Sequence, residues 1–165
     1  MISALRLGWY KVHRPVEYYA AYFTVRGEDF DGILVAQGRE AVRRRMNEIT
    51  MKGKEASKKE EDAFATLQIV NEMLARGIQV LPVDLYRSHA KKYLVEDGKV
   101  RLPFASLGGV GEAAANSLYE AGQQGAYISV DDLQARSKVS KSVIEMLNEA
   151  GALKDLPQSS QMTLF

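Results

Sequence analysis

Glycines are concentrated in one segment of the chain, Leu107-Gly-Gly-Val-Gly-Glu-Ala-Ala-Ala-Asn-Ser-Leu118. Gly109 and Gly111 can adopt a positive φ and carry no side chain that would hold a ligand away. They precede a predicted helix, whose first N–H groups lack backbone partners and whose dipole favours a nearby anion. A phosphate of a nucleic-acid backbone fits such a site, which reads no base. The expected contacts are Gly109, Val110, Gly111 and Ala113; the alternative is a turn that only connects two helices.

A similar apolar spacing recurs without glycines in Lys138-Val-Ser-Lys-Ser-Val-Ile-Glu-Met-Leu147. The first segment matches the helix-hairpin-helix pattern, in which a hydrophobic–glycine turn opens a helix, and we interpret the second as a diverged copy. Lys138, Ser140 and Lys141 would then replace backbone amides as phosphate contacts. Because tandem hairpins pack as a pseudo-symmetric pair, a mainly structural role for this copy stays open.

The sequence ends with Gln161-Met-Thr-Leu-Phe165, after the polar stretch 157–160. These five residues resemble the Q-x-x-L-F peptide with which bacterial replication proteins bind the sliding clamp. A flexible tail suits this task, since the peptide must leave its own domain to enter a pocket. The predicted clamp-binding residues are Gln161, Met162, Leu164 and Phe165.

Composition narrows the remaining possibilities. The chain has no cysteine, which excludes disulfides and Cys-ligated metal centres, and its two histidines, His13 and His89, lie far apart. We therefore expect no metal site built on Cys or His in these 165 residues. No apolar run approaches the length of a membrane span, so we expect a cytoplasmic protein without a membrane partner.

The net charge of +1 conceals a basic stretch from Arg39 to Lys59. Eight basic and three acidic residues give this stretch a formal charge of +5. Such a run can be a solvated helix face or a nucleic-acid surface, and the sequence leaves both open.

The first half of the chain has helical periodicity. Pro15 suits a first helical position, and it is followed by an apolar i, i+3, i+4, i+7 stripe that comprises Val16, Tyr19, Ala20 and Phe23. Ser57 and Glu60 form a capping-box pattern before a further helix, and Gly77 marks its end. The interval 52–59 is predicted as a loop. We interpret Trp9 and the nearby tyrosines as core residues.

The second half begins with a different pattern. Residues 78–83 suit an edge strand because of Pro82, and residues 93–102 suit a β-hairpin around Asp97-Gly98. Helices are predicted near 112–122, 129–136 and 140–150, with Ser129 and Ser140 as start signals. The fold class is therefore mainly α, with a small β hairpin.

A family resemblance covers the whole chain in order. Gly8-Trp-Tyr-Lys-Val-His-Arg-Pro-Val-Glu-Tyr-Tyr-Ala-Ala-Tyr-Phe-Thr-Val-Arg26 resembles the late fingers region of the PolC-type DNA polymerase III α subunit of low-GC Gram-positive bacteria. Val83-Asp-Leu-Tyr-Arg-Ser88, the glycine segment, Asp132-Leu-Gln-Ala-Arg136 and the tail continue the likeness.

The resemblance implies a layout for the chain. Residues 1–77 would be the helical end of a fingers domain, and 78–105 a connector with a β-hairpin. Residues 106–157 would be a tandem helix-hairpin-helix module that binds duplex DNA non-specifically, and 158–165 a flexible tail that binds the β sliding clamp. The family uses Mg²⁺ bound to palm carboxylates, which have no counterpart here. The resemblance therefore predicts that the chain alone is inactive and holds no catalytic residue, no metal and no cofactor of its own. The remainder of the polymerase would be a further partner.

Two other functions remain as alternatives. Helix-hairpin-helix DNA glycosylases place a catalytic Asp shortly after a G-V-G hairpin, as Asp131 lies after Gly111. The position at which the bifunctional members carry a nucleophilic Lys holds Ala113, although the monofunctional members lack that Lys as well. Asp131 and Asp132 also have a sufficient local role in the helix that follows Ser129. A non-catalytic clamp adaptor would bind the clamp and show no salt-sensitive DNA binding.

Overall fold

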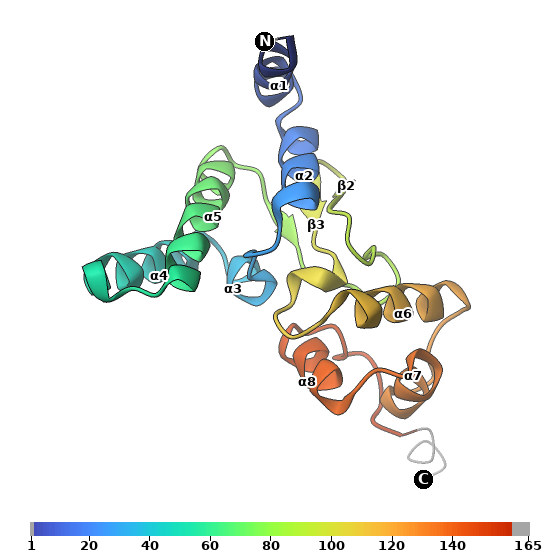
Figure 1. The fold of residues 1–165 in the computed structure, drawn as a ribbon. Coiled ribbons are helices and arrows are strands. Elements are labelled where there is room, and N and C mark those ends of the chain that lie inside the picture. The colour runs from blue at the N-terminus through green and yellow to red at the C-terminus, as the bar shows by residue number, and fades with distance from the viewer. Residues whose placement is uncertain (1, 160–165) are drawn as a thin grey trace.

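The computed structural model describes residues 2–159, with side chains from residue 8 onwards. Helices dominate, and three short strands lie at the centre, so the predicted fold class, mainly α with a small β hairpin, is confirmed. Figure 1 shows three extensions around this centre. One carries the N-terminal helices, a second carries α4 and α5, and the third holds α6, α7 and α8.

Helices α1 (Ile2–His13) and α2 (Pro15–Arg26) follow one another with only Arg14 between them. Pro15 opens α2 as predicted, and the stripe buries Tyr19, Ala20 and Phe23. The interpretation of Trp9 as a core residue is wrong, because its side chain is 51% exposed. Trp9 packs against Tyr10 and His13 on its own helix instead.

A short helix, α3 (Gly32–Ala36), leads into the pair α4 (Arg39–Lys52) and α5 (Lys58–Ala75). The predicted capping box is present, since Ser57 accepts from the Glu60 amide while Glu60 accepts from the Ser57 amide. The predicted loop at 52–59 is too long. A 3₁₀ turn, Gly53–Glu55, extends α4, and the capping box starts α5 already at Lys58.

The small sheet contains β1 (Val80–Leu81), β2 (Leu94–Glu96) and β3 (Lys99–Arg101) in the order β1-β3-β2. Strands β2 and β3 form the predicted hairpin, with Asp97 and Gly98 both at positive φ in its turn. Strand β1 lies at one edge, as Pro82 indicated, and pairs with β3 in parallel. The hairpin is therefore only part of the sheet.

A 3₁₀ turn, Phe104–Ser106, leads to α6 (Glu112–Gln123), α7 (Val130–Ser137) and α8 (Lys141–Glu149). All three helices confirm the sequence prediction to within two residues. Ser129 is the N-cap of α7 and Ser140 that of α8, with hydroxyls that accept from the Asp132 and Val143 amides. These caps are local features, which is why the sequence was sufficient to place the starts of α7 and α8.

The buried side chains form one continuous cluster from α2 to the segment after α8. Its largest fully buried members come from both halves of the chain: Tyr19, Phe23, Met73, Phe104, Leu118, Leu133 and Leu147. The core thus joins the N-terminal helices to the helices that follow the sheet. The predicted domain limits stay predictions.

Candidate nucleic-acid interface

The first predicted hairpin is the turn between the 3₁₀ segment and α6. Gly109 has φ +85, a left-handed conformation that favours glycine. The Val110 side chain is buried, and its N–H donates to the Leu107 carbonyl over 3.1 Å. Val110 therefore anchors the turn in the core, and its amide is already engaged within the protein.

The amides that remain open lie one step further along the chain. Gly111 is the N-cap of α6 and provides no side-chain acceptor, and the first α6 bond within the helix runs from the Ala115 amide to the Gly111 carbonyl. The N–H groups of Glu112, Ala113 and Ala114 therefore have no helical partner. Gly111 and Ala113, both predicted contacts, are exposed at this end.

The fold does not require glycine at Gly111. Its φ of −73 and ψ of 172 are ordinary for an N-cap, and an added Cβ would meet no atom within 4 Å. The same is true of the space around Gly108. Packing therefore does not explain the absence of side chains here, whereas the close approach of a ligand would.

The second hairpin repeats the backbone of the first. Lys138 has φ +60, as Gly109 has φ +85, and buried Val139 takes the place of Val110. Ser140 then caps α8 with φ −73 and ψ 165, close to the values at Gly111. The segment interpreted as a diverged copy is a structural repeat.

The two copies differ at their helix N-termini. The Ser140 hydroxyl accepts from the Val143 amide over 3.4 Å and lies 2.9 Å from the Ser142 hydroxyl. The cap thus satisfies one N–H group at the start of α8, whereas the equivalent N–H group at the start of α6 has no acceptor from a capping side chain. Lys138 and Lys141 are exposed beside it, without an ion pair in the part of the chain described. The first hairpin therefore offers open amides, and the second mainly offers positive charge.

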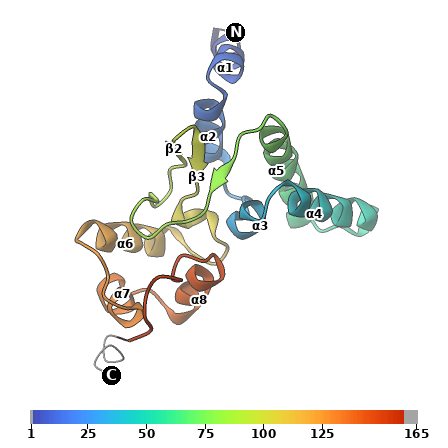
Figure 2. The same ribbon diagram turned by 180° about the vertical axis from the view of Figure 1, so that it is seen from behind.

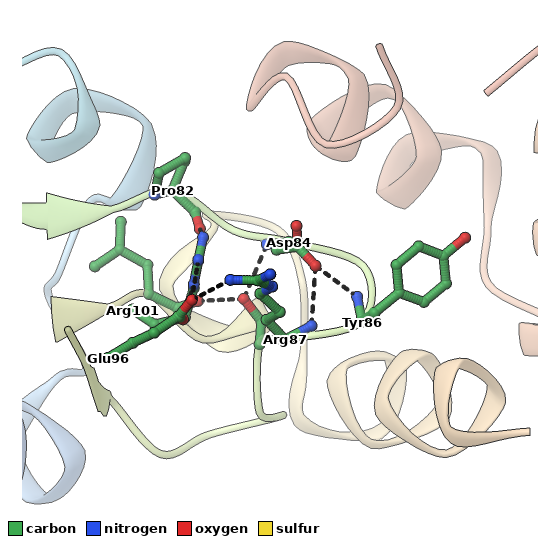
Figure 3. Close-up of polar contacts among 8 residues, drawn as sticks. Pro82, Asp84, Tyr86, Arg87, Glu96 and Arg101 are labelled. Atoms are coloured by element: carbon green, nitrogen blue, oxygen red, sulfur yellow. Dashed lines mark hydrogen bonds and ion pairs between the residues drawn. The ribbon is translucent and has the colours of Figure 1, made fainter. Parts of the chain in front are cut away.

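The connector before the hairpins holds a polar network, drawn in Figure 3. The Asp84 carboxylate accepts from the Tyr86 and Arg87 amides, both at 2.9 Å. Glu96 accepts two bonds from buried Arg101, at 2.7 and 2.8 Å, and one from Arg87 at 2.6 Å. The Arg101 guanidinium and, less strongly, Arg87 hold the pKa of the Glu96 carboxyl at about 2, well below its usual 4.5.

This network reaches the hairpin module through Tyr86. The Tyr86 hydroxyl accepts from the Tyr127 amide over 3.1 Å, and the two rings stack with centroids 5.8 Å apart. A Cβ on Gly122 of α6 would lie 2.8 Å from the Leu85 carbonyl, so the connector and α6 are in close contact. In the sequence, the segment Val83–Ser88 was informative only as part of the family resemblance. No local pattern there indicated that this segment positions α6.

Asp132 and Arg136 likewise have structural partners. Asp132 accepts from the Ile128 amide, while Arg136 donates to the carbonyls of Ala121, Gly125 and Ala126 and lies over the Tyr127 ring. Arg136 thus joins the end of α6 to α7. The local role expected for Asp132 at the start of α7 is confirmed.

The residues described hold no cluster of three or more His, Cys, Asp or Glu side chains that could bind a metal ion. None of the described helices is long and apolar enough to cross a membrane. The predicted clamp-binding residues, Gln161, Met162, Leu164 and Phe165, lie outside the described range.

Comparison with known proteins agrees with this geometry. A family described as "Helix-hairpin-helix motif" matches residues 77–162, about half of the chain. The chain belongs to the helix-hairpin-helix family. The match includes both hairpins, the connector and the sheet.

Relatives of this helix-hairpin-helix protein carry the name DNA polymerase III PolC-type, and the resemblance found in the sequence is thereby confirmed. The protein from Thermotoga petrophila is 44% identical over 98% of this chain and 12% of its own length. That from Clostridium perfringens is 44% identical over the whole chain and 11% of its own length. That from Bacillus cereus is 43% identical over the whole chain and 12% of its own length. The chain thus spans about one-eighth of these relatives.

Proposed function

We propose that this chain is the part of a PolC-type replicative polymerase that holds duplex DNA by its phosphate backbone, without reading the bases. The observation that carries the proposal is the uncapped N-terminus of α6 behind exposed Gly108, Gly109 and Gly111. Free amides and the helix dipole attract a phosphate at this end. The repeated backbone at Lys138–Ser140 supports a paired arrangement along one duplex.

Binding through amides and lysines predicts a dependence on salt rather than on sequence. Each phosphate that a protein neutralises contributes about −0.9 to the slope of log K against log salt on duplex DNA. A hairpin pair that contacts about two to four phosphates gives a slope of roughly −2 to −4. Duplexes of different sequence and equal length should bind alike.

Gly111→Asp tests the site. Aspartate suits the N-cap geometry at Gly111, so the variant should fold, but its carboxylate would accept the α6 amides and occupy the place of the phosphate. We expect most duplex binding to be lost in fluorescence anisotropy titrations, with an unchanged circular dichroism spectrum. Gly8→Asp is the matched control, because it adds the same charge at an exposed glycine of α1 where an added Cβ would meet no atom within 4 Å. A folded Gly111→Asp protein with undiminished affinity and salt slope would place the phosphate site elsewhere.

We also propose that the terminal peptide docks the β sliding clamp. The support is its pattern, with Gln161 as a polar anchor and Leu164 and Phe165 as apolar ones. The preceding residues are attached to the hairpin module, since the Pro157 and Gln158 carbonyls accept from the amides that open α7. A clamp on this peptide would therefore be tethered to the module that holds the duplex.

We propose that nucleotide transfer belongs to the remainder of the parent polymerase, as the family resemblance implies. A cytoplasmic location belongs to the same proposal. The N-terminal helices offer a surface for the rest of the polymerase chain. There a groove of about 720 Å³ is lined mainly by Tyr10, Tyr18, Tyr22 and Val25, and Trp9 is half exposed beside it. Exposed aromatic clusters of this kind suit a protein contact.

A further inference from the structure

The pair α4 and α5 forms an arm that extends from the centre of the molecule. Both views of the ribbon show the two helices side by side, with their connecting turn at the outer end (Figures 1 and 2). Buried Val42 and Ile49 of α4 face the core of this arm, together with Leu67 and Val70 of α5. We call residues 39–59, which hold the basic stretch, the basic arm.

Several charges of the basic arm are used internally. Arg45 pairs with Glu48 at 3.2 Å and with Glu60 at 3.3 Å, and Lys52 pairs with Glu60 at 2.6 Å. The Lys52 ammonium, with the Ser57 amide, holds the pKa of the Glu60 carboxyl at about 2. Glu60 is therefore ionised at neutral pH and joins the end of α4 to the start of α5.

The remaining cations are not neutralised. Arg43, Arg44, Lys54 and Lys59 are exposed, and none has a carboxylate partner among the described residues. Arg39 also has no carboxylate partner there, because its guanidinium donates to the side-chain oxygen of Asn71. Two acids of the basic arm, Glu40 and Glu55, are likewise without an ion pair among the described residues, so five unpaired cations against two acids leave a surplus of three positive charges. Arg43 and Arg44 are adjacent on α4, between buried Val42 and half-buried Arg45.

The basic arm and the first hairpin face a common groove. Its volume is about 770 Å³, and it is lined by Arg45 and Lys59 on the arm and by Gly108 and Gly109 on the hairpin. Carboxylates of Glu28, Asp29, Asp31 and Glu149 also line it. These acids repel a phosphodiester chain, so favourable charge for DNA lies at the arm and at the hairpin rather than between them.

We propose that the free cations of the basic arm, Arg43 and Arg44 above all, bind the phosphate backbone of the same duplex that the first hairpin holds. This inference rests on the proposed function, because the hairpin sets where the duplex lies. Arginine suits the contact, since its guanidinium matches a phosphate with two donors. Exposed cations also suit a partner whose charge repeats regularly and whose sequence varies.

The experiment measures duplex binding against salt concentration for R43Q/R44Q in the full chain. Both side chains are exposed, so the fold should persist. The slope of log K against log salt should become shallower by about 2, since each lost phosphate contact removes roughly 0.9. The matched control is R14Q/R26Q, which removes two exposed arginines at the ends of α2 that have no ion pair within the part of the chain that the structure describes. Its slope should stay close to that of the unaltered protein.

The Gly111→Asp variant separates this inference from the proposed function. If Gly111→Asp loses binding while R43Q/R44Q matches its control, the hairpin function stands and the arm inference is overturned. If R43Q/R44Q loses binding while Gly111→Asp does not, the arm binds DNA but the hairpin proposal fails. Loss in both variants, with a smaller slope in each, is the expected result.

Discussion

At Glu96, one carboxylate accepts from two arginines, and one of these, Arg101, is buried. Arg101 also donates to the Pro82 carbonyl over 3.0 Å, so its charge is matched by a carboxylate and a backbone acceptor. Loss of Glu96 would leave a buried guanidinium with one acceptor. Bonds to charged groups stabilise by about 1.5–3 kcal/mol each, and a buried charge without its partner is costly.

This pair predicts a specific dependence of stability on pH. The folded protein lowers the Glu96 pKa from 4.5 to about 2, so its ionised form stabilises the fold above pH 4.5, and that contribution is lost as the pH falls towards 2. We expect Glu96→Gln to cost about 1–3 kcal/mol in urea denaturation at pH 7 and much less at pH 2.5. Glu145→Gln is the control, because Glu145 of α8 is exposed and has no ion pair among residues 2–159. A Glu96→Gln deficit that is equal at both pH values would contradict the assignment.

At the scale of single elements, local signals were sufficient wherever a side chain caps its own helix. Ser57, Ser129 and Ser140 each accept from an amide three residues later, and each marked a helix start that the structure has. Trp9 shows the limit of such reasoning. An aromatic residue on an amphipathic helix suggests burial, but the partner that decides burial is a tertiary one. The parallel pairing of β1 with β3 was likewise out of reach, because it joins residues 20 positions apart.

Ser140 caps the helix of the second hairpin, whereas the first hairpin has Gly111 at the same position. Variants of Ser140 test what this cap contributes to stability and to duplex binding. Ser140→Ala should cost about 0.5–2 kcal/mol of stability because α8 loses its cap. Ser140→Asp keeps an acceptor there and should stay close to the unaltered protein in stability. Since the α8 amides are already capped, we expect Ser140→Asp to weaken duplex binding less than Gly111→Asp does. Equal losses in anisotropy titrations would mean that both hairpins bind phosphate through their amides.

At the scale of the whole molecule, the pattern of the glycine segment predicted an anion site, and its position relative to the basic arm required the fold. The sequence showed the charges of the basic arm as a run of basic residues. It did not show that Glu48 and Glu60 neutralise Arg45 and Lys52, because these ion pairs depend on how α4 packs on α5. The connector also became interpretable only in three dimensions. Tyr86 and Tyr127 lie 41 residues apart in sequence, and their contact helps to fix α6 on the sheet.

The proposed clamp peptide would link two contacts, that of the sliding clamp with the tail and that of the duplex with the hairpins. Burial of a Leu or Phe side chain contributes roughly 1.5–3 kcal/mol, and ordering of the peptide offsets part of this gain. We therefore expect calorimetry with the isolated clamp to give a micromolar dissociation constant, which corresponds to a binding free energy on the order of −8 kcal/mol. L164A/F165A should abolish this binding and leave duplex binding intact, while Thr163→Ala, between the anchors, should change neither.

With the clamp loaded on the same duplex, each contact raises the effective concentration of the other. The tail begins at residues bonded to α7, inside the module that carries both hairpins, so a short span suffices. Retention on clamp-loaded DNA should then exceed retention on bare DNA by at least tenfold, and either L164A/F165A or Gly111→Asp should remove this gain. A double variant L164A/F165A with undiminished clamp affinity would refute the role of the tail, whatever the hairpins do.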